Sequence, residues 1–265
     1  MNIEELTEEI EDWLEKADEE ETLKFLKYPL EESLEGAIII ELLGHYGAVA
    51  QSVAKKLLST GTNQKKLAGV FSSYLTEMVQ LKAGSILLPI TLVKMRIGST
   101  NFIITTTSFP IPDVVSYQLA EELMAFYNRI KPSKIILIDG VHSYNRDIDT
   151  TPSIHHITSF KPGTSSPEDE KSNFTMMGQV ASSLLTYYLN SRNIPIELLL
   201  VDSFADTDPI SSLEVLTQLN REYGDILDLS DLKEEAIIFK NNFKKFNGKS
   251  SSIKEILTSE SQFFV

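Results

Sequence analysis

Residues 133–141 (SKIILIDGV) constrain the fold more than any other stretch of the chain. Four consecutive large apolar residues, Ile135 to Ile138, precede Asp139, and three of the four are β-branched. A strand with one face in water alternates apolar and polar residues, whereas an unbroken apolar run is typical of a strand buried on both faces. We therefore predict a central strand here, with other layers of structure covering both of its faces.

A helix is predicted just before this strand. Between residues 113 and 130, apolar residues recur at helical spacing, and Lys131-Pro132 ends the pattern. The recurring residues are Val114, Leu119, Leu123, Phe126, Tyr127 and Ile130. A helix followed by a parallel strand is the repeating unit of α/β sheets, so we predict a three-layer α/β/α domain with a mixed, mainly parallel sheet. In such a domain, the strand ends would hold any small-molecule site.

Other segments extend this alternation. Strands are predicted at residues 36–43, 67–74, 86–95, 101–107 and 196–201, and helices at 48–58, 173–192 and 209–223. Gly98-Ser99 indicates a hairpin turn, Pro89 indicates an edge or bulge, and Asp208 is a predicted N-cap with Pro209 at the first helical position. The region 142–171 is predicted to be a long loop.

Three regions are expected along the chain. Residues 1–35 form an acidic helical extension, in which Ile3, Leu6, Ile10, Trp13 and Leu14 fall on one stripe of an amphipathic helix, followed by a second short helix reaching residue 27. This extension is either a docking arm or a solvated helix that packs its tryptophan on the domain. Residues 36–225 form the α/β domain. Residues 226–265 are helical at 229–246 and 253–257 and end in a tail.

Composition excludes several classes of function. The net charge is −14, so the average surface repels nucleic acid and anionic lipid, and we expect neither as a partner. The absence of cysteine rules out disulfides, thiolate zinc sites and cysteine nucleophiles. The chain has neither a basic and apolar leader nor an apolar run of the ~20 residues that a membrane span needs. We expect a protein of the cytoplasm or the nucleus.

Glycines occur at the turn between the first strand and its helix, residues 44–47 (GHYG). Exposed amides at a helix start bind anions, so this turn could hold phosphate. Neither Gly-x-Gly-x-x-Gly nor Gly-Lys-Ser/Thr is present, however, and close packing is the preferred explanation.

Polar residues follow the predicted central strands. Asp139, His142, Asp202 and Asp206 come at the carboxyl ends, where α/β enzymes place catalytic groups. Asp202, Asp206 and Asp208 could also hold a hard cation. Acids at these positions more commonly cap the next helix, and no Gly-x-Ser-x-Gly elbow is present. His155-His156 is expected in a solvated loop. We predict no catalytic residue, no metal and no cofactor.

The last residues, Phe263, Phe264 and Val265, follow a polar spacer. Two aromatic residues gain nothing from remaining in water. They dock either on their own domain or on another protein, and the residues alone do not decide between the two.

The ordered set of elements over residues 36–223 resembles the proteasome assembly chaperone family, a likeness that rests on the series of segments rather than on one motif. The acidic beginning, the lead into the first strand at residues 27–29, the long loop and the segment 253–258 (IKEILT) are most similar to its chaperone 1 members. The main alternative is a small-molecule enzyme of the nucleoside-phosphorylase type, which has a comparable sheet with acids and a histidine at strand ends.

The resemblance implies a chaperone of 20S proteasome assembly that is not an enzyme. Members of the family pair as heterodimers, so the implied partners are a sister proteasome assembly chaperone 2 and the α-subunits of the α-ring. The family ends in a hydrophobic residue, a tyrosine and any last residue, which enter a pocket between α-subunits. Phe263, Phe264 and Val265 match this motif, with Phe264 in place of tyrosine, so one hydrogen bond would be lost.

Overall fold

The structure is a computed structural model that describes residues 23–27, 33–44, 48–72, 80–82, 85–107, 111–143, 146–158, 182–187, 194–204, 207–224 and 226–260. The amphipathic N-terminal helix predicted from residue 2 therefore lies outside the described residues. Residues at the end of the predicted second helix form a strand instead, β1 (Leu23–Lys27). A short isolated helix is costly to nucleate, whereas the open edge of β3 offers these residues backbone hydrogen bonds.

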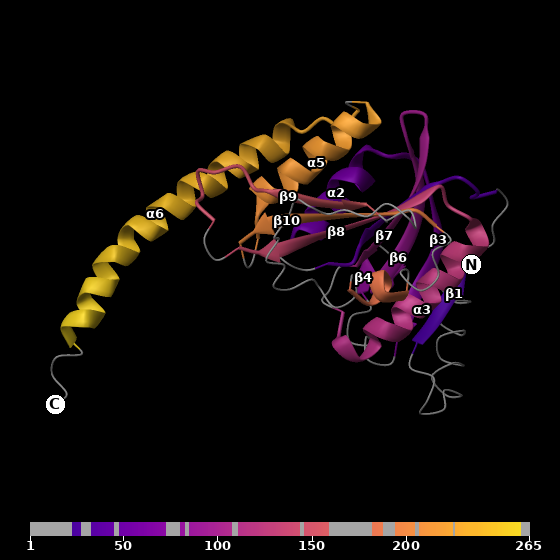
Figure 1. Cartoon of the computed structure of the whole chain (residues 1–265), viewed down its shortest axis with the longest axis horizontal. Coiled ribbons are helices and arrows are strands. Elements are labelled where there is room, and N and C mark those ends of the chain that lie inside the picture. Colours follow the sequence, from indigo (N-terminus) through magenta and orange to yellow (C-terminus); the bar gives the residue numbers. More distant parts are fainter. Residues whose placement is uncertain are drawn as a thin grey trace, which may run out of the picture.

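Eight of the described strands form one sheet in the order β1-β3-β6-β7-β2-β8-β10-β9 (Figure 1). Their bounds after β1 are β2 (Ile38–Leu42), β3 (Thr62–Ser72), β6 (Ile90–Ile97), β7 (Thr100–Thr107), β8 (Lys134–His142), β9 (Ile154–Thr158) and β10 (Ile196–Ser203). Two further strands, β4 (Gln80–Lys82) and β5 (Ser85–Leu87), pair with each other. The predicted strand at 86–95 thus divides into β5 and β6 around Pro89, which has no N–H for a ladder.

Parallel pairing is confined to the centre of the sheet. Strands β7, β2, β8 and β10 pair in parallel, and the other four pairings of this sheet are antiparallel. The mixed sheet is confirmed, although its parallel part is smaller than the mainly parallel sheet we predicted. One reason is the predicted hairpin between β6 and β7, where Gly98 adopts φ 59° and the short turn permits only antiparallel pairing.

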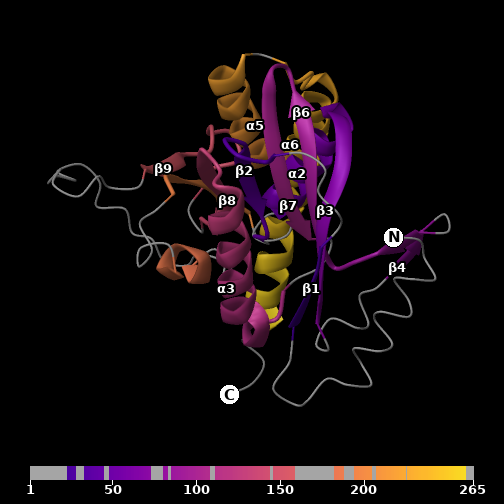
Figure 2. The ribbon, with the colours of Figure 1, turned by 90° about the vertical axis from the view of Figure 1, so that its right-hand side faces the viewer.

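Helices cover both faces of the sheet, which confirms the three layers (Figures 1 and 2). Helix α3 (Asp113–Ile130) packs in one apolar core, and α2 (Val49–Thr60) with α5 (Pro209–Tyr223) packs in the other. Successive residues of β8 alternate between them, because Ile135 and Leu137 lie in the first core and Ile136 and Ile138 in the second. The central strand is therefore buried on both faces, as predicted.

The helices follow the predicted signals with two exceptions, one on the buried face of α3 and one in the length of the last helix. Asp208 caps α5 by accepting hydrogen bonds from the N–H groups of Ile210 and Ser211, and Lys131 ends α3 in a left-handed conformation. Val114, predicted on the buried face of α3, is exposed, and Val115 is buried instead. Within the predicted helix at 173–192, residues 182–187 are described, and they are helical.

The second exception is α6 (Ser230–Glu260), which is one helix of 31 residues where we predicted two pieces. Gly248 and the serines at 250–252 lie between the two predicted pieces. These residues lower helix propensity by about 1 kcal/mol or less each but, unlike proline, leave the backbone hydrogen bonds intact. None of the helices that the structure describes combines the length and the hydropathy that a membrane span requires.

Strand β9 lies inside the segment predicted as a loop. It pairs antiparallel with β10 at the edge of the sheet, from Ile154 opposite Val201 to Thr158 opposite Glu197. The sequence IHHIT does not alternate between apolar and polar residues, so no periodic pattern indicated a strand. The pairing arises from the neighbouring edge of β10, which only the folded sheet supplies.

The carboxyl group of Glu41 lies in the middle of the sheet. Glu41 on β2 is 3% exposed, and its Oε2 accepts a hydrogen bond from the Tyr127 hydroxyl of α3. Thr105, opposite Glu41 on β7, shares a hydrogen bond of 2.8 Å with the same hydroxyl. Burial raises the pKa of Glu41 from 4.5 to about 8, and the Tyr127 hydrogen bond opposes this rise. The folded protein thus holds Glu41 protonated at neutral pH.

This raised pKa predicts a pH-dependent stability. Between pH 4.5 and about 8 the folded state retains the Glu41 proton and the unfolded state loses it. The free energy of unfolding therefore falls as pH rises through this window, by at most about 1.4 kcal/mol per pH unit. Glu41→Gln removes this contribution because a glutamine does not titrate. In urea denaturation from pH 5 to 8, the free energy of unfolding of the variant should therefore rise relative to that of the wild type as the pH increases.

Glu35→Gln is the control, because Glu35 is exposed. Its stability curve should run parallel to that of the wild type. A Glu41→Gln curve that also runs parallel would show that Glu41 is charged in the folded protein.

Candidate functional site

The carboxyl ends of the parallel strands meet at one edge, where sequence analysis placed the candidate catalytic residues. In the register of β8 with β10, Val141 lies opposite Asp202 and His142 opposite Ser203. Asp139, His142 and Asp202 therefore lie at the predicted edge. Asp206 lies outside the described residues.

Asp139 has a structural environment. Its side chain is fully buried, and Oδ1 accepts a hydrogen bond of 2.8 Å from the N–H of Gly140. A Cβ at Gly44 would lie 2.0 Å from the same oxygen, so the turn after β2 packs directly on the Asp139 carboxyl group. Close packing therefore accounts for the glycine at position 44, as preferred from the sequence. The group that packs against it is the side chain of Asp139 on β8.

Asp202 joins β10 to β9. Its Oδ1 lies 3.1 Å from His155 Nε2, and its N–H donates to the carbonyl of Ser153. Both side chains are about a quarter exposed. The prediction that His155 and His156 belong to a solvated loop is wrong, since both are on β9 and His155 pairs with Asp202. A histidine and a carboxylate do meet here, but they hold an edge strand in place.

Arg146 is the residue at this edge that sequence reasoning missed. Its Nη1 donates to the Asp202 carbonyl at 2.8 Å, to Ser211 Oγ at 2.7 Å and to the carboxylate of Asp208. The side chains of Arg146 and Asp208 are 3% and 0% exposed. The sequence offered one signal, a single arginine in the predicted loop at 142–171 and three aspartates just after the strand predicted at 196–201. This pattern predicts an ion pair but not its location.

Asp208 has no capacity left for a metal. One oxygen caps α5, and the other accepts from the N–H of Phe204 and from Arg146. Asp202 is occupied by His155. Within the ranges that the structure describes, no group of three or more His, Cys, Asp or Glu side chains could hold an ion.

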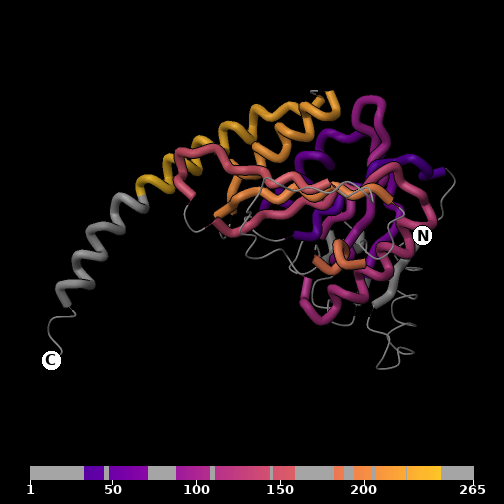
Figure 3. Tube along the Cα trace, viewed as in Figure 1, coloured from indigo at the N-terminus to yellow at the C-terminus, as the bar shows by residue number. Residues whose placement is uncertain are grey.

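Helix α6 packs over the same edge. The Arg146 guanidinium lies 4.6 Å from the ring centroid of Phe204, which in turn contacts Phe243 of α6 at 4.8 Å. The segment 146–153 runs against the helix (Figure 3), where Lys240 and Lys244 each lie 2.7 Å from Asp149. These two lysines, by hydrogen bonding to the carboxylate, lower the pKa of Asp149. The carboxyl edge is thus filled by Arg146 and flanked by α6.

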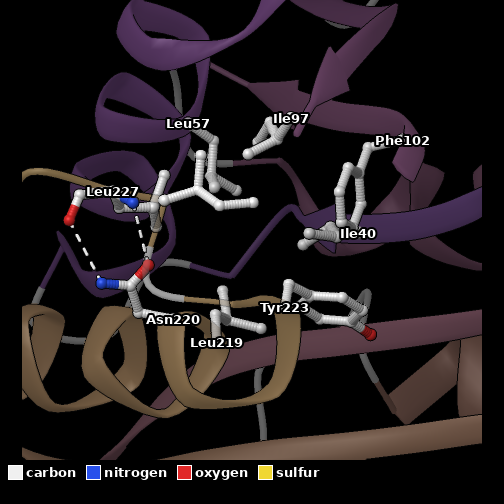
Figure 4. A pocket seen from close by; sticks show the side chains of 9 residues that line it. Ile40, Leu57, Ile97, Phe102, Leu219, Asn220, Tyr223 and Leu227 are labelled. Atoms are coloured by element: carbon white, nitrogen blue, oxygen red, sulfur yellow. Dashed lines mark hydrogen bonds between the residues drawn. The ribbon is translucent and has the colours of Figure 1, made fainter. Parts of the chain in front are cut away.

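An apolar hollow lies away from this edge, between α2, α5 and the sheet (Figure 4). It offers about 270 Å³, part of it open to solvent, and is lined by Ile40, Leu57, Ile97, Phe102, Leu219, Asn220, Tyr223, Ile226 and Leu227. The Asn220 amide bonds both backbone groups of Leu227. This polar group is therefore used in holding the loop, and the hollow has no convergent groups to orient a ligand.

The predicted partner-binding residues Phe263, Phe264 and Val265 lie outside the described residues, so the structure does not place that site.

The architecture is shared with solved structures. PbaB of Pyrococcus furiosus, an archaeal proteasome activator, superimposes with a TM-score of 0.68 at 18% identity, covering 85% of this chain and 99% of its own. PbaA of the same organism, an archaeal homologue of proteasome-assembly chaperone, gives 0.62 at 17% identity, with 92% and 100% covered. A Corynebacterium glutamicum protein of unknown function gives 0.67 at 14% identity, with 91% and 96% covered.

Comparison of sequences tests the family more directly than comparison of folds does. A search of curated proteins finds no significant match. The sequence profile described as "PAC2 family", in contrast, matches residues 42–246, from the end of β2 to the middle of α6. This match spans three of the four parallel strands, β7, β8 and β10, together with the filled carboxyl edge and the helices on both faces. The family resemblance inferred from the sequence is thereby confirmed, without selecting the chaperone 1 type, and the chain belongs to the PAC2 family.

Proposed function

We propose that this protein is a chaperone of 20S proteasome assembly that acts by binding and not by catalysis. The observation on which this rests is the family match over residues 42–246. Two structures of the same fold, PbaB and PbaA, are described as a proteasome activator and a homologue of proteasome-assembly chaperone. At 18% and 17% identity these likenesses support the fold alone, and the descriptions of the two proteins agree with the proposed role.

The filled carboxyl edge favours binding over catalysis. In an α/β enzyme this edge is a crevice for substrate, and its polar groups are held ready for a ligand. Here Nη1 of Arg146 already donates to the Asp208 carboxylate and to the Asp202 carbonyl, while its Nε and Nη2 are buried with no hydrogen-bond partner among the described residues. This arrangement supports the chaperone proposal over the nucleoside-phosphorylase type of enzyme, which would require the same residues to contact substrate.

The finer parts of the proposal come from the sequence. The protein would be of the chaperone 1 type, pair with a sister chaperone 2 and work in the cytoplasm and nucleus. Its last residues, Phe263, Phe264 and Val265, would enter a pocket of the α-ring. Each buried phenylalanine contributes roughly 1.5–3 kcal/mol, and ordering a free tail offsets part of this. The tail therefore needs the folded domain as a second contact.

A pull-down tests the role. Tagged protein expressed with its native tail should retain proteasome α-subunits and a sister chaperone from cell extract. His142→Ala and Asp202→Ala should retain the same amounts, because binding needs neither a base nor a metal ligand. Recovery of no α-subunit, together with a small-molecule turnover that either variant abolishes, would replace the chaperone proposal with the enzyme.

Removal of the tail should separate binding from folding. Deleting residues 263–265 should weaken binding to purified α-ring by roughly tenfold or more, because two buried rings and a carboxylate are lost. The melting temperature should stay unchanged. Phe264→Tyr is the matched variant and should bind as well or better, since it restores the family's hydroxyl. A truncated protein that binds normally but melts earlier would mean that the rings pack on their own domain.

Arg146→Met tests whether the filled edge is structural. The substitution keeps much of the side-chain volume but leaves the Asp208 carboxylate buried without its cation, so the free energy of unfolding should fall by about 3–5 kcal/mol in urea. Lys56→Met is the control, because its partner Asp231 is 72% exposed and the pair contributes about 1 kcal/mol or less. An Arg146→Met protein as stable as wild type would indicate an arginine held for a ligand.

A further inference from the structure

The outer face of α3 presents two apolar side chains that the core does not take in. Val114 and Tyr117 are 63% and 60% exposed, whereas the apolar residues on the other side of the same helix are buried. The two lie three residues apart, so they are neighbours on one face, and the exposed Glu121 follows one turn later. Neighbouring exposed apolar side chains of this kind mark a contact with another molecule.

A second ring holds Tyr117 in place. The centroid of the Tyr117 ring lies 4.8 Å from that of Tyr187, at an interplanar angle of 47°. Tyr187 belongs to the helical residues 182–187, which lie beside α3 (Figures 1 and 2). These residues are anchored, because Leu184 is buried in the core that α3 also enters and Tyr187 packs against that core. A partner that contacts Tyr117 therefore has less side-chain motion to restrict.

Carboxylates accompany the two rings. From Asp113 to Asn128, α3 has three acids and no lysine or arginine. Partial burial is the largest cause of a raised pKa at the Tyr187 hydroxyl, and the nearby Tyr117 hydroxyl and Glu121 carboxylate raise this pKa further. Glu121 lies about two turns into α3, whereas the helix dipole acts within the first turn. None of the ion pairs between described residues uses Glu121.

An exposed tyrosine ring beside a carboxylate suits a cation. The face of the ring attracts an ammonium or guanidinium group that lies within about 6 Å of its centroid. Among the described residues, the contacts of this kind use other rings, with Lys134 on Tyr223 and Arg146 on Phe204. An apolar neighbour such as Val114 can cover the alkyl stem of a lysine or arginine. The face therefore has the chemistry to bind one basic side chain.

The surroundings decide what carries this cation. A small free cation would bury too little of its surface on an open helix face. Anionic lipid and nucleic acid would be repelled by the carboxylates. A second copy paired about a two-fold axis would place this acidic face against itself, and like charges opposed across an interface are unfavourable. A different protein with a basic face is instead attracted by the net charge of −14.

We propose that the face of α3 formed by Val114, Tyr117 and Glu121, together with Tyr187, docks a lysine or arginine that another protein presents among apolar side chains. The cation lies on the Tyr117 ring within reach of the Glu121 carboxylate, and its alkyl stem covers Val114. The surrounding contact excludes water, which strengthens both attractions. This surface uses no residue of the tail, so the proposal can fail while the proteasome role stands, and the reverse also holds.

Photo-cross-linking in the native cells identifies the partner. Full-length protein with p-benzoylphenylalanine in place of Val114 keeps Tyr117 and Glu121. It should link to a peptide of another protein that contains a lysine or arginine next to apolar residues. Ile237 is the control site, because it is 61% exposed but lies on α6, and it should not link to that peptide. A link from position 114 to a second copy, to a peptide without a basic residue or to no protein at all would overturn the proposal.

Charge exchange with the purified partner tests the contact itself. Glu121→Lys should weaken binding about tenfold, and replacing the linked basic residue of the partner with glutamate should restore it. Glu235→Lys is the control, since it makes the same change at an exposed acid of α6 and should bind like the wild type. Equal binding by the two variants, or failure of the exchanged pair to recover, would contradict the proposed contact.

Two substitutions of Tyr117 separate the cation from an ordinary apolar contact. Tyr117→Phe should bind the partner like the wild type, whereas Tyr117→Leu should weaken binding several-fold, because only phenylalanine keeps the aromatic face. The side chain is exposed, so the melting temperature should stay the same in both variants. A Tyr117→Leu protein that binds normally would show that no cation lies on the ring.

Discussion

The buried ion pair between Arg146 and Asp208 joins parts of the chain that are otherwise held separately. Arg146 comes from the loop after β8, and Asp208 comes from the turn after β10 and caps α5. Because both side chains are almost fully removed from water, the buried Asp208 carboxylate depends on Arg146 and on the hydrogen bonds that it accepts from the N–H groups of Phe204, Ile210 and Ser211. Those bonds define the path of the turn, and the turn positions Phe204 against α6.

This pair also changes what the carboxyl edge of the sheet can bind. In an open α/β sheet, the crevice beyond the carboxyl ends of the strands is the usual place for a ligand. Here the protein's own guanidinium occupies that position. Two of the aspartates that could have bound an ion or a substrate are already engaged, Asp202 by His155 and Asp208 by Arg146 and backbone amides. The same architecture can then support a function based on surfaces and termini, which is the kind of function that assembly factors need.

Charge is distributed unevenly along the chain in a way that the net value of −14 conceals. The beginning is acidic and the outer part of α6 is basic, and the contact of α6 with the domain already combines an aromatic cluster with lysine–carboxylate pairs. Exposed pairs of this type add little stability to a folded domain. Their larger effect is on the choice of partner and on the rate of association.

The sequence by itself determined the layers and most elements. Unbroken apolar runs such as Ile135 to Ile138 have no stable position except inside a covered sheet, and the caps at Asp208 and Pro209 act through adjacent backbone, so local reading was sufficient. It could also place Asp139, His142 and Asp202 at one edge, since parallel strands end together. Only the tertiary structure decided that β1 and β9 are strands, because their stabilisation comes from the open edges of β3 and β10. It alone brought Arg146 to Asp208, 62 residues apart, since the burial that makes this pair strong does not exist until both loops meet.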